Sequence, residues 1–308
     1  MRIALICPGE TGCNDNPGCA IITAGVRWLL GQAFPGAVIV RVEMLRDNDG
    51  HWRAAATCDA AILCGNPRIT LSEDAWWEDG ILDRLVALQA AGIKVVDGWA
   101  GACIGSMEAI EGAAERLLNH PRNRRNMGRL AKLSGVIARD PLMQAVCERA
   151  GISSVMLPCS SWWAARHYGV SGKAEKTTDI VVLGPNMPLD GFIVESGFKI
   201  IAPTLGDYDA ASRAGLDVEL ISDPPSLLAA MSRARRVLSG RIHSAIPAAS
   251  LGAAVCVASI DSRALTCAPF GIGIIKAGEL RQTSGPIFAP AAEPYLSETV
   301  AVLRKMMT

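Results

Sequence analysis

The sequence is poor in aromatic residues and in histidine, and its charges cancel. Aromatic side chains make up 5% of the 308 residues, and 30 Lys and Arg balance 30 Asp and Glu. This balance argues against a nucleic-acid-binding protein, because such domains carry a net basic charge. The four histidines are far apart and lack the spacing of metal ligands, so the sequence predicts no metal site: His51, His120, His167 and His243.

Long hydrophobic runs and nucleotide-binding loops are also missing. Only five apolar residues follow Arg2, too few for a signal peptide or a membrane span. No CxxC pair occurs among the ten cysteines, so we expect reduced thiols and a cytoplasmic protein. A peripheral contact with the inner face of the membrane stays open. The chain has no P-loop and no GxGxxG spacing, so neither of these nucleotide loops is expected.

The chain does have enough apolar material for two domains. Half of its residues are hydrophobic, and its length is about twice that of a usual domain. Both halves alternate short β-rich runs with helical patterns, which predicts an α/β fold of two Rossmann-like domains facing a cleft. The polar stretch GVSGKAEKTTD is the expected linker. We therefore predict an N-terminal domain over residues 1–170 and a C-terminal domain over residues 178–308, which ends in a helix.

The most informative stretch is RVLSGRIHSAIPAASLGAAVCVASIDSR, residues 236–263. Its apolar runs and small-residue centre predict a β-α-β unit, with Arg241 and His243 where the first strand meets the helix. Helix N-termini at such an edge attract anions. Arg241 offers a fork of donors to a phosphate or carboxylate, and His243 can exchange a proton near neutral pH. Three small neighbours can add donors without crowding an anion: Ser239, Gly240 and Ser244.

These residues carry a family resemblance. The stretch is similar to the C-terminal signature of the polysaccharide pyruvyltransferase family, which has R-x-H, a small-residue helix, a strand and then an Asp, here Asp261. Residues 16–21, NPGCAI, resemble the Asn-x-Gly-Asp-x-Ile segment of that family, and Arg139-Asp140 resembles its RD segment. The resemblance spans about residues 2–275.

The resemblance implies a glycosyltransferase-B-like protein that moves the pyruvyl group of phosphoenolpyruvate onto two sugar hydroxyls. The product is a cyclic ketal of a polysaccharide precursor, and phosphate is released. Phosphoenolpyruvate is a co-substrate, and no cofactor is expected. The N-terminal domain is expected to bind the acceptor, whether lipid-linked or not, and the C-terminal domain to bind phosphoenolpyruvate. The predicted site lies on loops at the strand edges that face the cleft. Its catalytic residues are Arg241 and His243. Its substrate-binding residues are Asn14, Asn16, Gly18, Arg139, Asn186, Ser239, Gly240, Ser244 and Asp261.

The N-terminal half departs from the family pattern. Residues 64–68, CGNPR, stand where the family has a glycine cluster, and Cys19 stands where it has an acid. Two other functions therefore stay open: a nucleotide-sugar glycosyltransferase of the same shape, and a non-catalytic divergent member.

The individual residues have structural interpretations too. Arg241 could pair with an acid, Asp140 and Asp261 could cap helices, and Asn16 could form a turn. The basic run over residues 121–129 is typical of a solvated loop, and a contact with a lipid diphosphate stays open.

Overall fold

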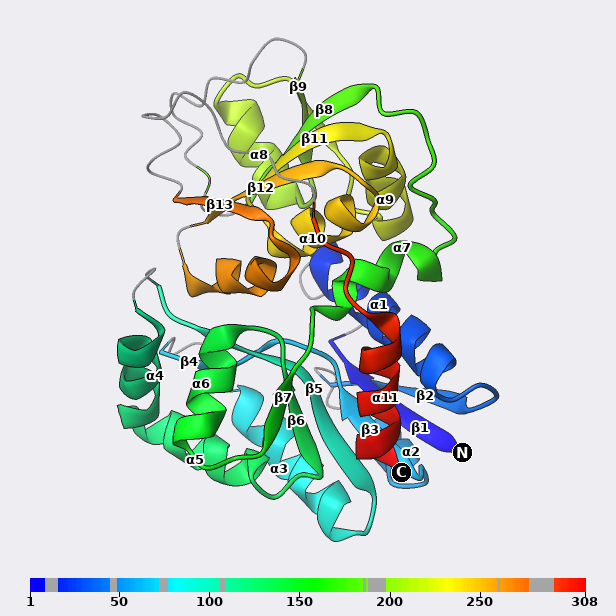
Figure 1. The fold of residues 1–308 in the computed structure, drawn as a ribbon, viewed down its shortest axis with the longest axis vertical. Coiled ribbons are helices and arrows are strands. Elements are labelled where there is room, and N and C mark those ends of the chain that lie inside the picture. The colour runs from blue at the N-terminus through cyan, green and yellow to red at the C-terminus, as the bar shows by residue number, and fades with distance from the viewer. Residues whose placement is uncertain are drawn as a thin grey trace. The chain divides into compact units, whose positions relative to one another are not determined.

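The chain forms two compact units, each with a parallel sheet and helices (Figure 1). The computed structural model describes residues 1–8, 16–44, 49–71, 77–105, 109–184, 187, 198–259, 261–276 and 291–308. The first unit comprises Met1–Gly9, Val26–Cys159 and Tyr295–Thr308, and the second comprises Glu10–Gly25 and Ser160–Pro294. The longer segment of the second unit thus begins at Ser160, before the expected linker over residues 169–179.

The sheet of the first unit has seven strands in the order β2-β1-β3-β5-β6-β7, with β4 paired to β5. Every pairing is parallel. The strands are β1 (Arg2–Cys7), β2 (Val38–Glu43), β3 (Ala60–Leu63), β4 (Pro67–Thr70), β5 (Lys94–Cys103), β6 (Gly135–Ala138) and β7 (Ser154–Met156). All four side chains of β3 are buried, as expected for a strand covered on both faces.

The helices of this part of the chain are α1 (Pro17–Ala33), α2 (Asp49–Ala55), α3 (Trp77–Ala90), α4 (Ile110–Asn119), α5 (Pro121–Leu130), α6 (Pro141–Arg149) and α11 (Leu296–Met307). The basic run over residues 121–129 thus lies in the helix α5 and not in a solvated loop. One face of this helix is buried. Asn123 is fully buried and donates from Nδ2 to the carbonyl oxygens of Thr70 and Leu117, at 3.1 and 2.9 Å.

The sheet of the second unit has six strands in the order β10-β9-β8-β11-β12-β13, again all parallel. The strands are β8 (Thr178–Val182), β9 (Phe198–Ala202), β10 (Val218–Leu220), β11 (Ala234–Ser239), β12 (Ala254–Ser259) and β13 (Gly273–Lys276). The helices are η3 (Ser160–Trp163), α7 (Ala164–His167), α8 (Leu205–Arg213), α9 (Pro224–Ser232), α10 (Ile242–Ser250) and η4 (Ser262–Phe270).

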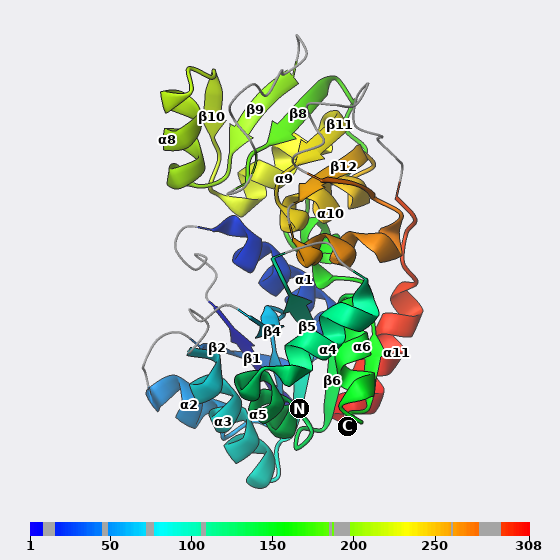
Figure 2. The same cartoon turned by 90° about the vertical axis from the view of Figure 1, so that its left-hand side faces the viewer.

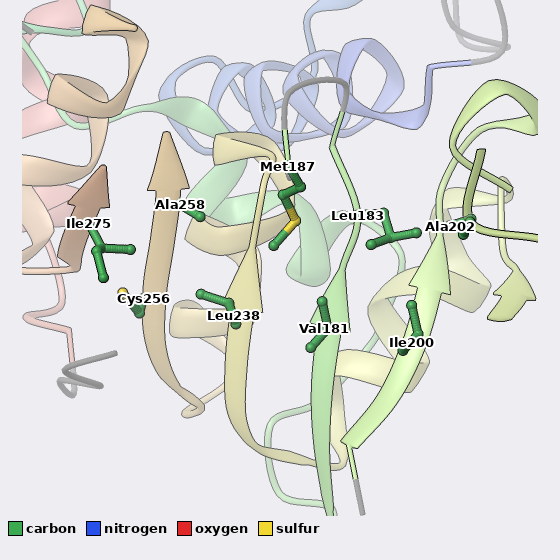
Figure 3. Close-up of a cluster of buried hydrophobic side chains, with 10 residues drawn as sticks. Val181, Leu183, Met187, Ile200, Ala202, Leu238, Cys256, Ala258 and Ile275 are labelled. Atoms are coloured by element: carbon green, nitrogen blue, oxygen red, sulfur yellow. The ribbon is translucent and has the colours of Figure 1, made fainter. Parts of the chain in front are cut away.

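One face of this second sheet is covered by a compact apolar cluster. Figure 3 shows Val181, Leu238 and Cys256 on the neighbouring strands β8, β11 and β12. Met187 packs on the same cluster beyond the end of β8 and is 7% exposed. This packing fixes the strand ends from which the predicted anion site is built.

The terminal helix α11 belongs to the first unit, whereas the sequence assigned it to the C-terminal domain. Arg304 Nε donates to the carbonyl oxygen of Ala33 at 2.7 Å, and the Met306 side chain lies against Gly135. Figure 2 shows α11 among the elements of the first unit. In the parts of the chain that the structure describes, no helix is long and apolar enough to cross a membrane.

Candidate functional site

The turn between β11 and α10 is closed by the hydroxyl group of Ser239. This hydroxyl accepts a hydrogen bond from Arg241 N at 3.1 Å and donates one to Arg241 O at 2.8 Å. Arg241 is the N-cap of α10, but its side chain makes no capping hydrogen bond. Because the first N–H groups of a helix have no partners within it, the turn offers donors to an anion.

The guanidinium group of Arg241 is held by a residue just after β8 and by one in the first turn of α8. Nε donates to the carbonyl oxygen of Leu183, after β8, at 3.2 Å, and Nη2 donates to Oδ2 of Asp207, after β9, at 2.6 Å. The side chains of Arg241 and Asp207 are 16% and 6% exposed. Nη1 makes no hydrogen bond to the part of the chain that the structure describes. The acid pairing that the sequence left open is therefore present, and it leaves donors of the fork available.

Asp207 is itself fixed by the start of α8. Thr204, the N-cap of this helix, accepts a hydrogen bond from Asp207 N at 3.2 Å and donates its hydroxyl hydrogen to Asp207 Oδ2 at 2.6 Å. The sheet order β9-β8-β11 explains why these residues meet, because parallel strands end at one edge of the sheet.

A second helix start lies against His243. A Cβ atom added to Gly18, in the first turn of α1, would lie 3.3 Å from both Cβ and Nδ1 of His243. Asn16 caps this helix, since its Oδ1 accepts from Gly18 N at 3.0 Å. Asn16 thus has the local role that the sequence left open, and Gly18 allows the close approach of α1 to His243. Two positive helix ends therefore lie near the same imidazole ring.

Gly240 is needed for the packing of strand ends. A Cβ atom on Gly240 would lie 2.8 Å from Cγ of Met187 and 2.9 Å from Gly184 N, and one on Gly184 would lie 2.3 Å from Gly240 O. Gly240 N also donates to the carbonyl oxygen of Val182 at 2.9 Å. The contact of Gly240 with a substrate stays a prediction. Its lack of a side chain allows the backbone after β11 to pack closely against the backbone after β8.

Ser244 and Asp261 lie in the same unit and are both buried. Ser244 is 2% exposed in the first turn of α10. Asp261 caps η4, as the structural interpretation of the sequence expected: its carboxylate accepts from Arg263 N at 2.9 Å and from Arg263 Nη2 at 2.6 Å.

In the first unit, Asp140 is the N-cap of α6. Its carboxylate accepts from Met143 N at 2.8 Å and from Ala102 N at 3.3 Å. Burial raises the pKa of Asp140 to about 6, although the charge of Arg139 opposes the change. Arg139 is 1% exposed and packs on Gly101, where a Cβ atom would lie 2.6 Å from its Nε. In this arrangement Arg139 has almost no surface to offer a ligand.

Arg68, in the segment that replaces the glycine cluster of the family, forms a buried ion pair. Its Nε lies 3.2 Å from Oδ1 of Asp97, and its Nη2 donates to the carbonyl oxygen of Cys64 at 2.9 Å. Arg68 and Asp97 are 2% and 0% exposed. Burial raises the pKa of Asp97, an effect that Arg68 and Arg139 only partly oppose. The altered segment is thus integrated into the core.

The sequence matches the family model described as polysaccharide pyruvyl transferase over residues 16–262. The chain belongs to this family. The matched range begins at Asn16, the cap of α1, and ends at Ser262, just after β12, so it includes both helix starts beside His243. No curated protein matches the sequence of this polysaccharide pyruvyl transferase family member.

Solved structures of very different sequence share the fold. UDP-GlcNAc 2-epimerase from Neisseria meningitidis, bound to UDP-GlcNAc, is 10% identical, covers 99% of each chain and has a TM-score of 0.56. The Methanocaldococcus jannaschii UDP-GlcNAc 2-epimerase is 12% identical, again covers 99% of each chain and has a TM-score of 0.53. An α,α-trehalose-phosphate synthase from Burkholderia vietnamiensis is 10% identical over 97% of this chain and 90% of its own, with a TM-score of 0.51. The predicted glycosyltransferase-B-like α/β fold is confirmed.

Two predicted site residues of this pyruvyl transferase family member lie outside the described residues. Asn14 and Asn186 are outside the described residues. Within the described ranges, no group of three or more His, Cys, Asp or Glu could hold a metal ion. The cysteines in those ranges carry free thiols.

Thr204 and Asp207 were not predicted as site residues from the sequence. The pattern T-x-x-D before α8 is a readable capping signal. Its contact with Arg241 was not readable, because it depends on β9, β8 and β11 being neighbours in the sheet.

Proposed function

We propose that this protein transfers the pyruvyl group of phosphoenolpyruvate to two hydroxyls of a sugar or glycan acceptor. The product is a cyclic ketal, and inorganic phosphate leaves. Membership of the family supports this proposal. The strongest structural support is that Leu183 and Asp207 hold the guanidinium group of Arg241 in place. Arg241 stands two residues before His243 in the sequence. A fixed cation beside two helix starts suits a ligand that carries both a phosphate and a carboxylate.

Arg241 and His243 take separate roles in the proposed reaction. The Nη1 donors of Arg241 bind an anionic group of phosphoenolpyruvate, while His243 donates a proton to the methylene carbon. C2 then becomes an oxocarbenium-like centre, which the first sugar hydroxyl attacks. Cleavage of the C2–O bond to phosphate then makes C2 oxocarbenium-like again, and the second hydroxyl attacks it. One hydroxyl proton returns to His243, and the other leaves with the phosphate. A positioned acid contributes about 10²- to 10⁴-fold in rate.

The remaining predicted residues have proposed roles in substrate binding and none in catalysis. Asn14, Asn16 and Gly18 are proposed to face the acceptor, and Asn186, Ser239, Gly240, Ser244 and Asp261 are proposed to frame the phosphoenolpyruvate site. Of the first group, Asn16 and Gly18 lie at the start of α1. Arg139 enters the proposal only as a substrate-binding residue predicted from the sequence, since it is 1% exposed.

The deciding experiment is a calorimetric and thermal-shift titration with phosphoenolpyruvate. At a hundredfold excess over the dissociation constant, binding should add about 2.7 kcal/mol to the free energy of unfolding. Arg241→Lys keeps a charge beside Asp207 but lacks the planar fork, so it should bind about tenfold more weakly. Arg235→Lys is the matched control, because Arg235 lies at the other end of β11 and is 59% exposed.

The control ligands separate the alternative functions. Pyruvate and phosphate test whether both parts of phosphoenolpyruvate are needed, and UDP-GlcNAc tests a nucleotide-sugar glycosyltransferase. Stabilisation by UDP-GlcNAc and not by phosphoenolpyruvate would replace the proposal with that function. No response to any of the ligands would favour a non-catalytic member of the family.

A further inference from the structure

Asp207 has a contact that capping of α8 does not require. In a capping box the third helical residue reaches back to the backbone N–H of the N-cap. Here Oδ2 of Asp207 accepts from the Thr204 hydroxyl at 2.6 Å and from Arg241 Nη2 at 2.6 Å. The carboxylate therefore links the start of α8 to the start of α10. It is only 6% exposed, so water competes little for these bonds.

We propose that Asp207 is a positioning residue, which fixes the guanidinium group of Arg241 before an anion binds. This inference rests on the proposed function, in which that anion is phosphoenolpyruvate. Nε is bound by Leu183 O and Nη2 by Asp207, so the fork cannot rotate without breaking two hydrogen bonds. A side chain that is ordered in advance loses less conformational entropy when the ligand arrives.

Two effects of Asp207 on an anion have opposite signs. Its hydrogen bond orders Arg241 and strengthens binding, whereas its negative charge repels the ligand and weakens binding. Replacement by a neutral residue removes the charge in every case. Two neutral variants that differ in hydrogen bonding therefore isolate the ordering effect.

The test compares Asp207→Asn with Asp207→Ala by calorimetry with phosphoenolpyruvate. The Asn variant keeps an oxygen that can accept from Arg241 Nη2, and the Ala variant keeps none. We expect the Ala variant to bind about tenfold more weakly than the Asn variant, which corresponds to about 1.4 kcal/mol. When both changes are repeated in an Arg241→Ala background, the two variants should bind equally, because Asp207 then has no guanidinium group to order.

Equal affinity of the Asn and Ala variants in the normal background would overturn the proposal. A tenfold difference that persists in the Arg241→Ala background would also overturn it, because Asp207 would then act through α8 alone. If Asp207→Ala does not fold, Asp207→Ser replaces it, since the serine hydroxyl is too short to keep the contact with Arg241.

A second measurement separates this proposal from the proposed function. The Nη2–H protons of Arg241, which donate to Asp207 and are assigned in NMR spectra with Arg241→Lys, should exchange slowly in the unchanged protein and in Asp207→Asn. They should exchange rapidly in Asp207→Ala. If the unchanged protein does not bind phosphoenolpyruvate, the proposed function fails, and this exchange rate still decides whether Asp207 orders Arg241. Slow exchange in the Ala variant would refute the positioning role.

Discussion

The stability of the first unit should depend on the protonation of Asp140. This carboxyl group is fully buried at the start of α6, and burial raises its pKa from 3.8 to about 6. Between these values the folded protein keeps a proton that the unfolded chain has released. The contribution of Asp140 to the free energy of unfolding is therefore largest below pH 3.8, falls as the pH rises through 6, and is constant above that. At roughly 1.36 kcal/mol per pH unit, the whole fall is about 3 kcal/mol.

Asp140→Asn removes this dependence. Asparagine is a good N-cap and keeps an oxygen for Met143 N, but its amide nitrogen cannot accept from Ala102 N. The lost acceptor costs about 1–3 kcal/mol at every pH. The difference in unfolding free energy between the variant and the unchanged protein should therefore move by about 2.4 kcal/mol in favour of the variant from pH 4 to pH 7, most of the whole fall.

Urea unfolding at several pH values between 4 and 7 measures this difference. If the two units unfold in separate transitions, only the transition of the first unit should respond. Asp223→Asn is the matched control: Asp223 caps α9 and accepts from Ser226 N at 3.0 Å, but it is exposed and so lacks the burial that drives the effect. A difference between Asp140→Asn and the unchanged protein that stays constant with pH would refute the reasoning.

Two further substitutions test the two units separately. Arg68→Met should lower the free energy of unfolding by about 3–5 kcal/mol, because it leaves Asp97 buried without its partner, and adding Asp97→Asn should restore most of the loss; urea unfolding in which the double variant is no more stable than the single one would contradict this. Gly18→Ala places a methyl group 3.3 Å from Nδ1 of His243, so calorimetry should show phosphoenolpyruvate binding weakened severalfold with an almost unchanged melting temperature; unchanged affinity would show that His243 is not used.

The strands of the second unit and most of the first were readable from short apolar runs. The run Arg2–Cys7, for example, is β1 over its whole length. In contrast, β4 was not predicted, because it has only four residues, begins with a proline and carries Arg68, which interrupts the apolar pattern. Its arginine is tolerated because Asp97 on β5 neutralises it, and no local pattern reveals that pairing.

The candidate site was readable only where its residues are close in the sequence. The turn Ser239–Arg241 and the cap at Asp140 follow from residue types and their spacing. The approach of Gly18 to His243 and the pair of Arg241 with Asp207 join segments that are far apart in the chain. They depend on the order of the strands, which a hydrophobic pattern does not specify.

The division of the chain between the units has a consequence for fragments and chimeras. Residues 10–25 belong to the second unit, and Tyr295–Thr308 belongs to the first. A single cut near residue 160 would therefore yield an N-terminal piece without α11 and a C-terminal piece without the helix start that touches His243. Neither piece contains a whole unit. Exchange of the second unit with that of a related protein would require grafting residues 10–25 together with residues 160–294, because a single crossover near residue 160 separates His243 from the start of α1.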